Sequence, residues 1–321
     1  KSLGNALQPS DFFDKWGADP LRWFLVQNSQ PWLPTKISVD MVGEVSSKVF
    51  DTFRNVYSFF VTYANIDKWD PKDKGDAEFS VLDQWITSRM ETLKKTVYSL
   101  MESYDMTRAT REIGSFILDE VSNWYVRRSR RRFWGADMSP DKRAAYRTLR
   151  YVMLETAKLM APIAPMTADF YYTALNGDLE SVHLEELSPV VEEHINKTLE
   201  EDMKYVLGIA NAGRSVRMKA KIRIRQPLRT LYVMGARELD DNIMALLLDE
   251  LNVKEVAEAT ESFTVLAAKP NFRTLGRKLG KDIQKGKDAI TDLTHNVLQK
   301  VEAGESIEID AGGTKYQLDP E

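Results

Sequence analysis

The chain has 321 residues, of which 43% are hydrophobic and 10% aromatic, and this length predicts roughly two globular domains. It contains no cysteine, which excludes disulfides, thiol catalysis and cysteine-bound zinc. No apolar run is long enough for a membrane span, so we expect a protein that does not enter the membrane, and the absence of cysteine fits our expectation of a cytoplasmic protein. The net charge is −4.

Helical periodicity dominates from residue 10 to about 176. Asp19-Pro20 predicts a helix start, because aspartate is a good N-cap and proline is tolerated at the first helical position. Apolar residues then recur every three or four positions, as on the buried face of a helix. These stretches are 42–63, 82–104, 109–124 and 145–160, with a polar loop at 67–78 and a short helix at 167–175. The pattern predicts a connecting segment over 1–35 and an antiparallel helical bundle over 36–190.

The pattern changes after residue 190. We expect helices at 192–217, 240–251, 275–293 and 297–303, strands at 230–234, 253–256 and 263–267, and a final hairpin of 306–310 with 314–318. The hairpin would turn at Gly312-Gly313. Alternation in 221–225 predicts a further strand, with Ile222 and Ile224 pointing inward and the basic residues outward. Residues 191–321 are therefore predicted to form a smaller α+β domain behind a mainly α bundle.

No complete active site is visible in the sequence. The phosphate loop, dinucleotide fingerprint, nucleophile elbow and H-E-x-x-H motif are all missing. His183, His194 and His295 lie far apart, so we expect no metal site, because ligands usually come in closely spaced pairs. A free-standing enzyme is disfavoured.

Basic charge is concentrated in two stretches. Residues 204–229 hold eight Lys or Arg and no acid, and five arginines of 127–132 are flanked by aromatic residues. Such clusters indicate a polyanion partner, and aromatic side chains can stack on unpaired bases. We expect Trp124 in the core, and some of the five arginines to pair with acidic neighbours. The predicted RNA contacts are Arg127, Arg128, Arg131, Arg132, Trp134, Arg214, Arg217, Lys219, Lys221, Arg223 and Arg225. A third basic cluster spans 273–287, and solvated surfaces are the alternative interpretation of all three clusters.

Several short motifs resemble one enzyme family. Residues 1–5, KSLGN, resemble the second half of the KMSKS loop of class I aminoacyl-tRNA synthetases, and 17–22, GADPLR, resemble the G-A-D-x-L-R segment that follows it. Residues 123–134, NWYVRRSRRRFW, are similar to the eukaryotic-like branch of the isoleucyl-tRNA synthetases. RQPL at 225–228 and PNFRTLG at 270–276 are similar to the C-terminal region of that branch.

The resemblance implies a C-terminal fragment that begins inside the KMSKS loop and lacks the Rossmann catalytic domain and the editing domain. Lys1 and Ser2 match the end of the ATP-binding loop, so the fragment alone is expected to be inactive and to bind no cofactor. The parent enzyme would join isoleucine to tRNA-Ile through an aminoacyl-adenylate, using ATP and Mg²⁺. The fragment would bind the anticodon arm as a monomer. The alternatives are the equivalent part of a valyl-tRNA synthetase or related enzyme, and a helical scaffold for protein partners.

Overall fold

The computed structural model describes residues 7–259 and 268–319, which fall into two compact units. The first unit comprises Lys1–Leu228 and Glu238–Lys254, and the second comprises Arg229–Arg237 and Glu255–Glu321. The boundary predicted at residue 191 does not coincide with this division, because the long helix that follows it packs with the first unit. Lys1, Ser2 and the strand predicted at 263–267 lie outside the described residues.

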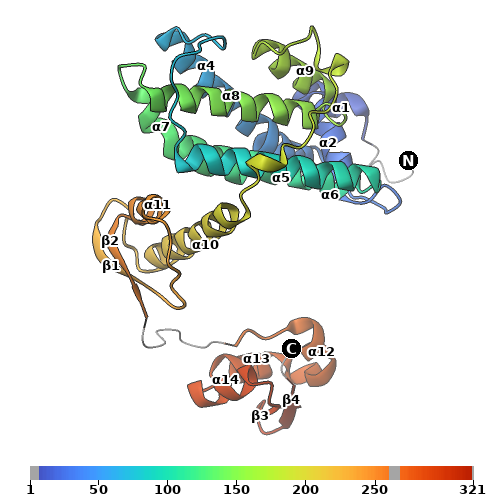
Figure 1. Ribbon diagram of the computed structural model, residues 1–321. Helices are drawn as coiled ribbons and strands as arrows, with labels where there is room; N and C mark the ends of the chain where they lie inside the picture. Colours follow the sequence, from blue (N-terminus) through green and yellow to red (C-terminus); the bar gives the residue numbers. More distant parts are fainter. Residues whose placement is uncertain (1–6, 260–267, 320–321) are drawn as a thin grey trace. The chain divides into compact units, whose positions relative to one another are not determined.

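The first unit is helical throughout the bundle (Figure 1). Its α-helices are α1 (Pro9–Trp16), α2 (Ala18–Asn28), α3 (Val39–Val45), α4 (Thr52–Asp67), α5 (Val81–Glu102), α6 (Met106–Ser115), α7 (Arg127–Trp134), α8 (Pro140–Met160), α9 (Pro165–Ala174), α10 (Lys197–Lys219) and α11 (Asp241–Leu251). Two π-helical stretches, η1 (Ser46–Asp51) and η2 (Phe116–Val126), and two short 3-10 turns, η3 (Val182–Leu184) and η4 (Glu192–His194), complete it.

Capping and apolar spacing explain where these helices begin and how they pack. Ser80 caps α5 in a capping box with Asp83, and Ser139 caps α8 just before a proline. Figure 1 shows α5 and α8 running side by side, and they contact each other along the bundle. Trp85, Trp124 and Tyr146 are buried between the helices. The predicted core position of Trp124 is therefore confirmed.

The second unit is small. It contains α12 (Phe272–Leu279), the 3-10 turn η5 (Gly280–Asp282), α13 (Ile283–Thr291), α14 (His295–Glu302) and the antiparallel hairpin of β3 (Ile307–Asp310) and β4 (Lys315–Leu318). Most of the two-stranded sheet of β1 (Leu228–Val233) and β2 (Val253–Glu258) also belongs to it. The core is the set Leu275, Leu279, Ile290, Ile307, Ile309 and Leu318.

The predicted fold class, a mainly α bundle followed by a smaller α+β part, is confirmed. Three details were wrong. Helix α2 begins at Ala18 with Gly17 as its N-cap, so Asp19 lies inside the first turn instead of capping it, and its carboxylate accepts from the N–H of Thr167 at 2.6 Å. The helix expected over 275–293 is interrupted at Gly280, whose φ of +49° suits glycine and ends α12. Residues 221–225 form turns instead of a strand, and Ile224 is 41% exposed. None of the helices in the described residues is long and apolar enough to cross a membrane.

Candidate nucleic-acid interface

Helix α7 presents the arginine-rich run on two opposite faces. It continues one long helix from α6 through η2, so its register is set by the buried residues before it. Ser129 and Phe133 are buried, and the side chains of Arg128 and Arg132 are each 13% exposed. The opposite face is exposed and carries Arg127, Arg130, Arg131 and Trp134. The 3.6-residue period therefore divides the run into an inward and an outward set.

Arg132 is held inside the bundle. Its Nη2 lies 2.6 Å from Oδ2 of the fully buried Asp83, and its Nε donates to Asp141 at 3.0 Å. Tyr125 donates its hydroxyl to Asp83 at 2.6 Å. Burial by itself lowers the pKa of Arg132, but the hydrogen bonds and charge of its partners outweigh it and raise the pKa. Arg132 thus neutralises a core carboxylate, and its predicted RNA contact finds no support in this geometry.

Glu250 joins three helices by accepting from three arginines. Its side chain, on α11, is 2% exposed. Arg127 Nη2 donates to it at 2.8 Å, Arg128 Nη1 at 3.4 Å, and Arg214 of α10 also pairs with it. Arg127 and Arg128 also lie 5.9 Å from the ring of Trp124, within cation–π range. Three predicted RNA-binding arginines therefore converge on one buried acid, which orients the end of α10 beside α7.

The basic residues at and just after the C-terminal end of α10 form a second exposed set. Lys219, Lys221, Arg223 and Arg225 are exposed, and no ion pair involving them occurs among the described residues. We call residues 219–226 the basic loop. Arg217, one turn earlier, is 5% exposed and bonds only to main-chain carbonyls in the described part of the chain. Of the predicted contacts, the four in the basic loop and those on the outer face of α7 are thus the accessible ones.

Two participants were missing from the prediction. Arg130 is exposed and lies four residues before Trp134. Residues at this spacing share one face of a helix, so the sequence could have placed Arg130 beside Trp134. Glu250 had no sequence signal, because it lies more than 30 residues from Arg214 and more than 120 from Arg127 and Arg128. Only folding brings this acid to the arginines.

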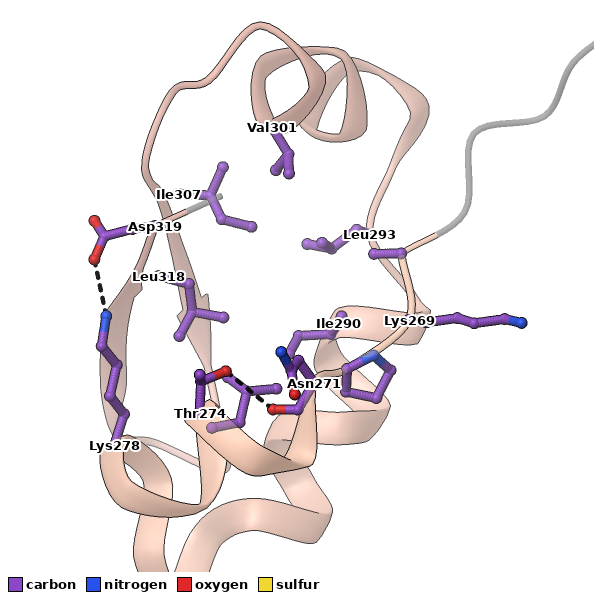
Figure 2. A pocket seen from close by; sticks show the side chains of 13 residues that line it. Lys269, Asn271, Thr274, Lys278, Ile290, Leu293, Val301, Ile307, Leu318 and Asp319 are labelled. Atoms are coloured by element: carbon purple, nitrogen blue, oxygen red, sulfur yellow. Dashed lines mark hydrogen bonds and ion pairs between the residues drawn. The ribbon is translucent and has the colours of Figure 1, made fainter. Parts of the chain in front are cut away.

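The second unit contains a separate cavity of about 130 Å³. Figure 2 shows Ile290, Leu293 and Ile307 around it, with the ion pair of Lys278 and Asp319 (2.8 Å) at one side. The apolar wall consists largely of core residues of this small unit. The third predicted basic cluster is thus partly paired with acids of its own unit, since Lys278 is neutralised there.

Comparison with known proteins defines the class of domain. Residues 83–232 match the family described as the anticodon-binding domain of tRNA ligase. This match includes α7, α10 and the basic loop. Over these residues the chain is therefore similar to an anticodon-binding domain of the tRNA-ligase type.

Whole-chain comparison gives the particular relationship. The chain is 37% identical to isoleucine–tRNA ligase of Porphyromonas gingivalis over 99% of its length, and 40% identical to that of Clostridium acetobutylicum over all of it. The Bacillus thuringiensis (strain Al Hakam) isoleucine–tRNA ligase is 42% identical over 88% of this chain. The chain is thus a homologue of part of the isoleucine–tRNA ligases, and it spans 28–32% of the length of these three relatives.

One solved structure gives a weaker match. A ternary complex of Agrobacterium radiobacter K84 LeuRS, tRNA and LeuAMS aligns with 61% of this chain and 22% of that one. The identity is 20% and the TM-score 0.47, a likeness too low to inform function.

Proposed function

We propose that this chain is the tRNA-binding part of an isoleucine–tRNA ligase and that it binds the anticodon arm of tRNA-Ile. One observation carries the proposal: Arg130 and Arg131 on the outer face of α7, together with the lysines and arginines of the basic loop, are exposed and have no acid partner among the described residues. Arg130, Arg131 and the basic loop would neutralise phosphates. Trp134, 58% exposed, would stack on an unpaired base, worth about 1–3 kcal/mol.

The whole enzyme would join isoleucine to tRNA-Ile through an aminoacyl-adenylate, with ATP and Mg²⁺, in the cytoplasm. Lys1 and Ser2, which match the end of the KMSKS loop, would act on the ATP phosphates only when the nucleotide pocket of the parent is present. We expect the chain alone to be monomeric and to catalyse no isoleucine-dependent ATP–pyrophosphate exchange. Exchange above background would contradict the assignment of catalysis to other parts of the enzyme.

The test is a titration of the chain with tRNA-Ile, an anticodon-swapped tRNA-Ile and tRNA-Val over a series of salt concentrations. We expect preference for the native tRNA and a fall of log K with log salt of roughly 0.7–0.9 for each neutralised phosphate. Preference for tRNA-Val would favour the valyl alternative. If tRNA binding does not depend on salt, the basic clusters are ordinary solvated surface. The alternative of a helical scaffold for protein partners would then be favoured.

A further inference from the structure

The basic loop is held from inside by one buried guanidinium. Arg217 Nη1 donates to the carbonyl of Arg223 at 3.1 Å, and Nη2 donates to that of Gln226 at 3.0 Å. Nη2 also reaches the carbonyls of Leu251 at 2.8 Å and Asn252 at 3.4 Å, at the C-terminus of α11. A cation there is favourable, because the last carbonyls of a helix carry partial negative charge. Arg217 thus ties the basic loop to a fixed helix end.

A second contact holds the middle of the loop. Asn252 has φ of +50° and donates its side-chain amide to the carbonyl of Ile224 at 3.0 Å. Its own carbonyl accepts from Leu228 N at 3.0 Å, where the loop has ended. The main chain between α10 and β1 is therefore fixed at three points while its cationic side chains face solvent.

The entry to the loop is also set by hydrogen bonds. The N–H of Lys221 bonds to the carbonyl of Met218 at 3.1 Å, and that of Ile222 bonds to the carbonyl of Arg217 at 2.8 Å. This is the Schellman pattern, which needs a left-handed residue, and Lys221 supplies it with φ of +57°. Glycine is the usual residue at this position. Lys221 therefore occupies a position that favours glycine, and its side chain is exposed.

We infer that Arg217 is a positioning residue that preorganises the basic loop as a phosphate grip, an inference that rests on the proposed tRNA binding. A loop that is already ordered loses less conformational freedom on binding than a mobile one. The four cations of the loop are then presented together to the RNA backbone. The planar guanidinium of Arg217 is required for this arrangement, since the ammonium group of a lysine cannot reach four carbonyls here.

The test uses R217K, which keeps the charge and removes the fork, and N252A, which removes the second tie. The matched control is R150K, because Arg150 likewise donates to the carbonyls of Leu175 (3.0 Å) and Asn176 (2.6 Å), at the end of α9. Each variant of the full chain is titrated with tRNA-Ile at several salt concentrations. Limited trypsin digestion is run in parallel, since Lys219, Lys221, Arg223 and Arg225 are cleavage sites.

R217K and N252A should each be cut faster in the basic loop and bind tRNA about tenfold more weakly, with a shallower salt slope as fewer phosphates are neutralised at once. R150K should match the wild type in both readouts. Faster cleavage with unchanged tRNA affinity would overturn the inference while leaving the proposed function intact. If the wild-type chain itself fails to bind tRNA, the proposed function fails and the inference falls with it. N252A decides the matter if R217K does not fold.

Discussion

At the scale of single residues, buried charge is tolerated here only with close partners. Asp83 is fully buried and is satisfied by Arg132 and Tyr125. Lys94 is 1% exposed and pairs with Glu91 at 2.9 Å. Such groups are expensive to leave unpaired, so their sequence positions tolerate little change.

Asp83→Asn should therefore destabilise the chain strongly. The substitution leaves the guanidinium of Arg132 buried without its main carboxylate, and breaking such a pair costs about 3–5 kcal/mol. Urea unfolding monitored by circular dichroism measures the difference. As a control, Glu308→Gln removes an exposed pair with Lys315 (2.7 Å) and should change the stability very little. Similar losses for both variants would contradict the structural role of Asp83.

Glu200 predicts a dependence of stability on pH. Burial by itself raises its pKa, but hydrogen bonds from Ser88 (2.5 Å), Thr92 (2.7 Å) and Lys197 (3.2 Å) outweigh it, and the pKa lies below its ordinary value of 4.5. A carboxylate with a lowered pKa stabilises the fold above its ordinary pKa and loses that contribution as the pH falls through the folded value.

Glu200→Gln should cost about 1–3 kcal/mol at neutral pH, and its deficit relative to the wild type should shrink as the pH falls below 4.5. Unfolding free energies of both proteins across this pH range provide the check. The exposed Glu44, paired with Lys48 at 3.4 Å, supplies the control substitution Glu44→Gln. A deficit that stays constant down to acid pH would be inconsistent with the lowered pKa.

At the scale of elements, one helix serves both the core and the surface. The inner face of α7 packs Phe133 against Phe59 and Tyr146 and pairs Arg132 with Asp83, while its outer face exposes Arg131 and Trp134. A double charge reversal at Arg131 and Arg132 would therefore weaken tRNA binding for two reasons that cannot be separated. The change at Arg132 destabilises the fold, and the change at Arg131 removes the proposed RNA contact. Only the outer residue can report on binding.

Arg131→Glu should weaken tRNA binding by about tenfold, because it removes one phosphate contact and adds repulsion. Lys95→Glu is the matched control: Lys95 is 62% exposed, on α5, and pairs with Glu192. The neighbouring Lys94 is unsuitable because it is buried. Filter binding or fluorescence titration compares the two variants, and equal losses would refute the localisation to α7.

Lys221→Gly separates the stability of the basic loop from its charge. Glycine relieves the cost of a left-handed conformation, so the unfolding midpoint should not fall. Affinity for tRNA should nevertheless drop several-fold and the salt slope should decrease by roughly 0.7–0.9, because one cation is lost. Thermal unfolding tests the expected stability, and a salt titration of tRNA binding tests the expected loss of affinity, both on the same preparation. Unchanged tRNA affinity would argue against a role for this side chain.

At the scale of the whole molecule, the two units differ in the size of their apolar cores. The first unit buries the side chains of Trp23, Trp85, Trp124, Tyr146 and many others, whereas the main core of the second is one cluster of six aliphatic residues. Apolar burial is the main favourable contribution to folding, so the smaller core gives less local stability.

Hydrogen exchange should reveal this difference. Amides of α12, α13 and the β3–β4 hairpin should exchange faster than those of α5 and α8, because the second unit can open without unfolding the first. Mass spectrometry of exchange at the peptide level distinguishes the two. Equal protection throughout would mean that the chain unfolds as one cooperative body.

Most secondary-structure elements of this protein, and the positions of its basic clusters, can be predicted from local sequence. Apolar spacing located most of the helices, Gly312-Gly313 located the turn of the final hairpin, and composition located the basic clusters. The wrong strand at 221–225 shows the limit of such patterns. Alternation of Ile with basic residues also fits a loop whose carbonyls are taken by Arg217 and Asn252.

The tertiary structure alone decided which cations face inward. Arg131 and Arg132 are neighbours of the same type, yet one is exposed and the other neutralises Asp83. The reason is physical: a guanidinium can enter the core only where a distant carboxylate or a helix end meets it, and such partners come from segments far away in the sequence. Sequence thus located the clusters of basic residues, and folding selected the side chains that stay exposed for the proposed contact with tRNA.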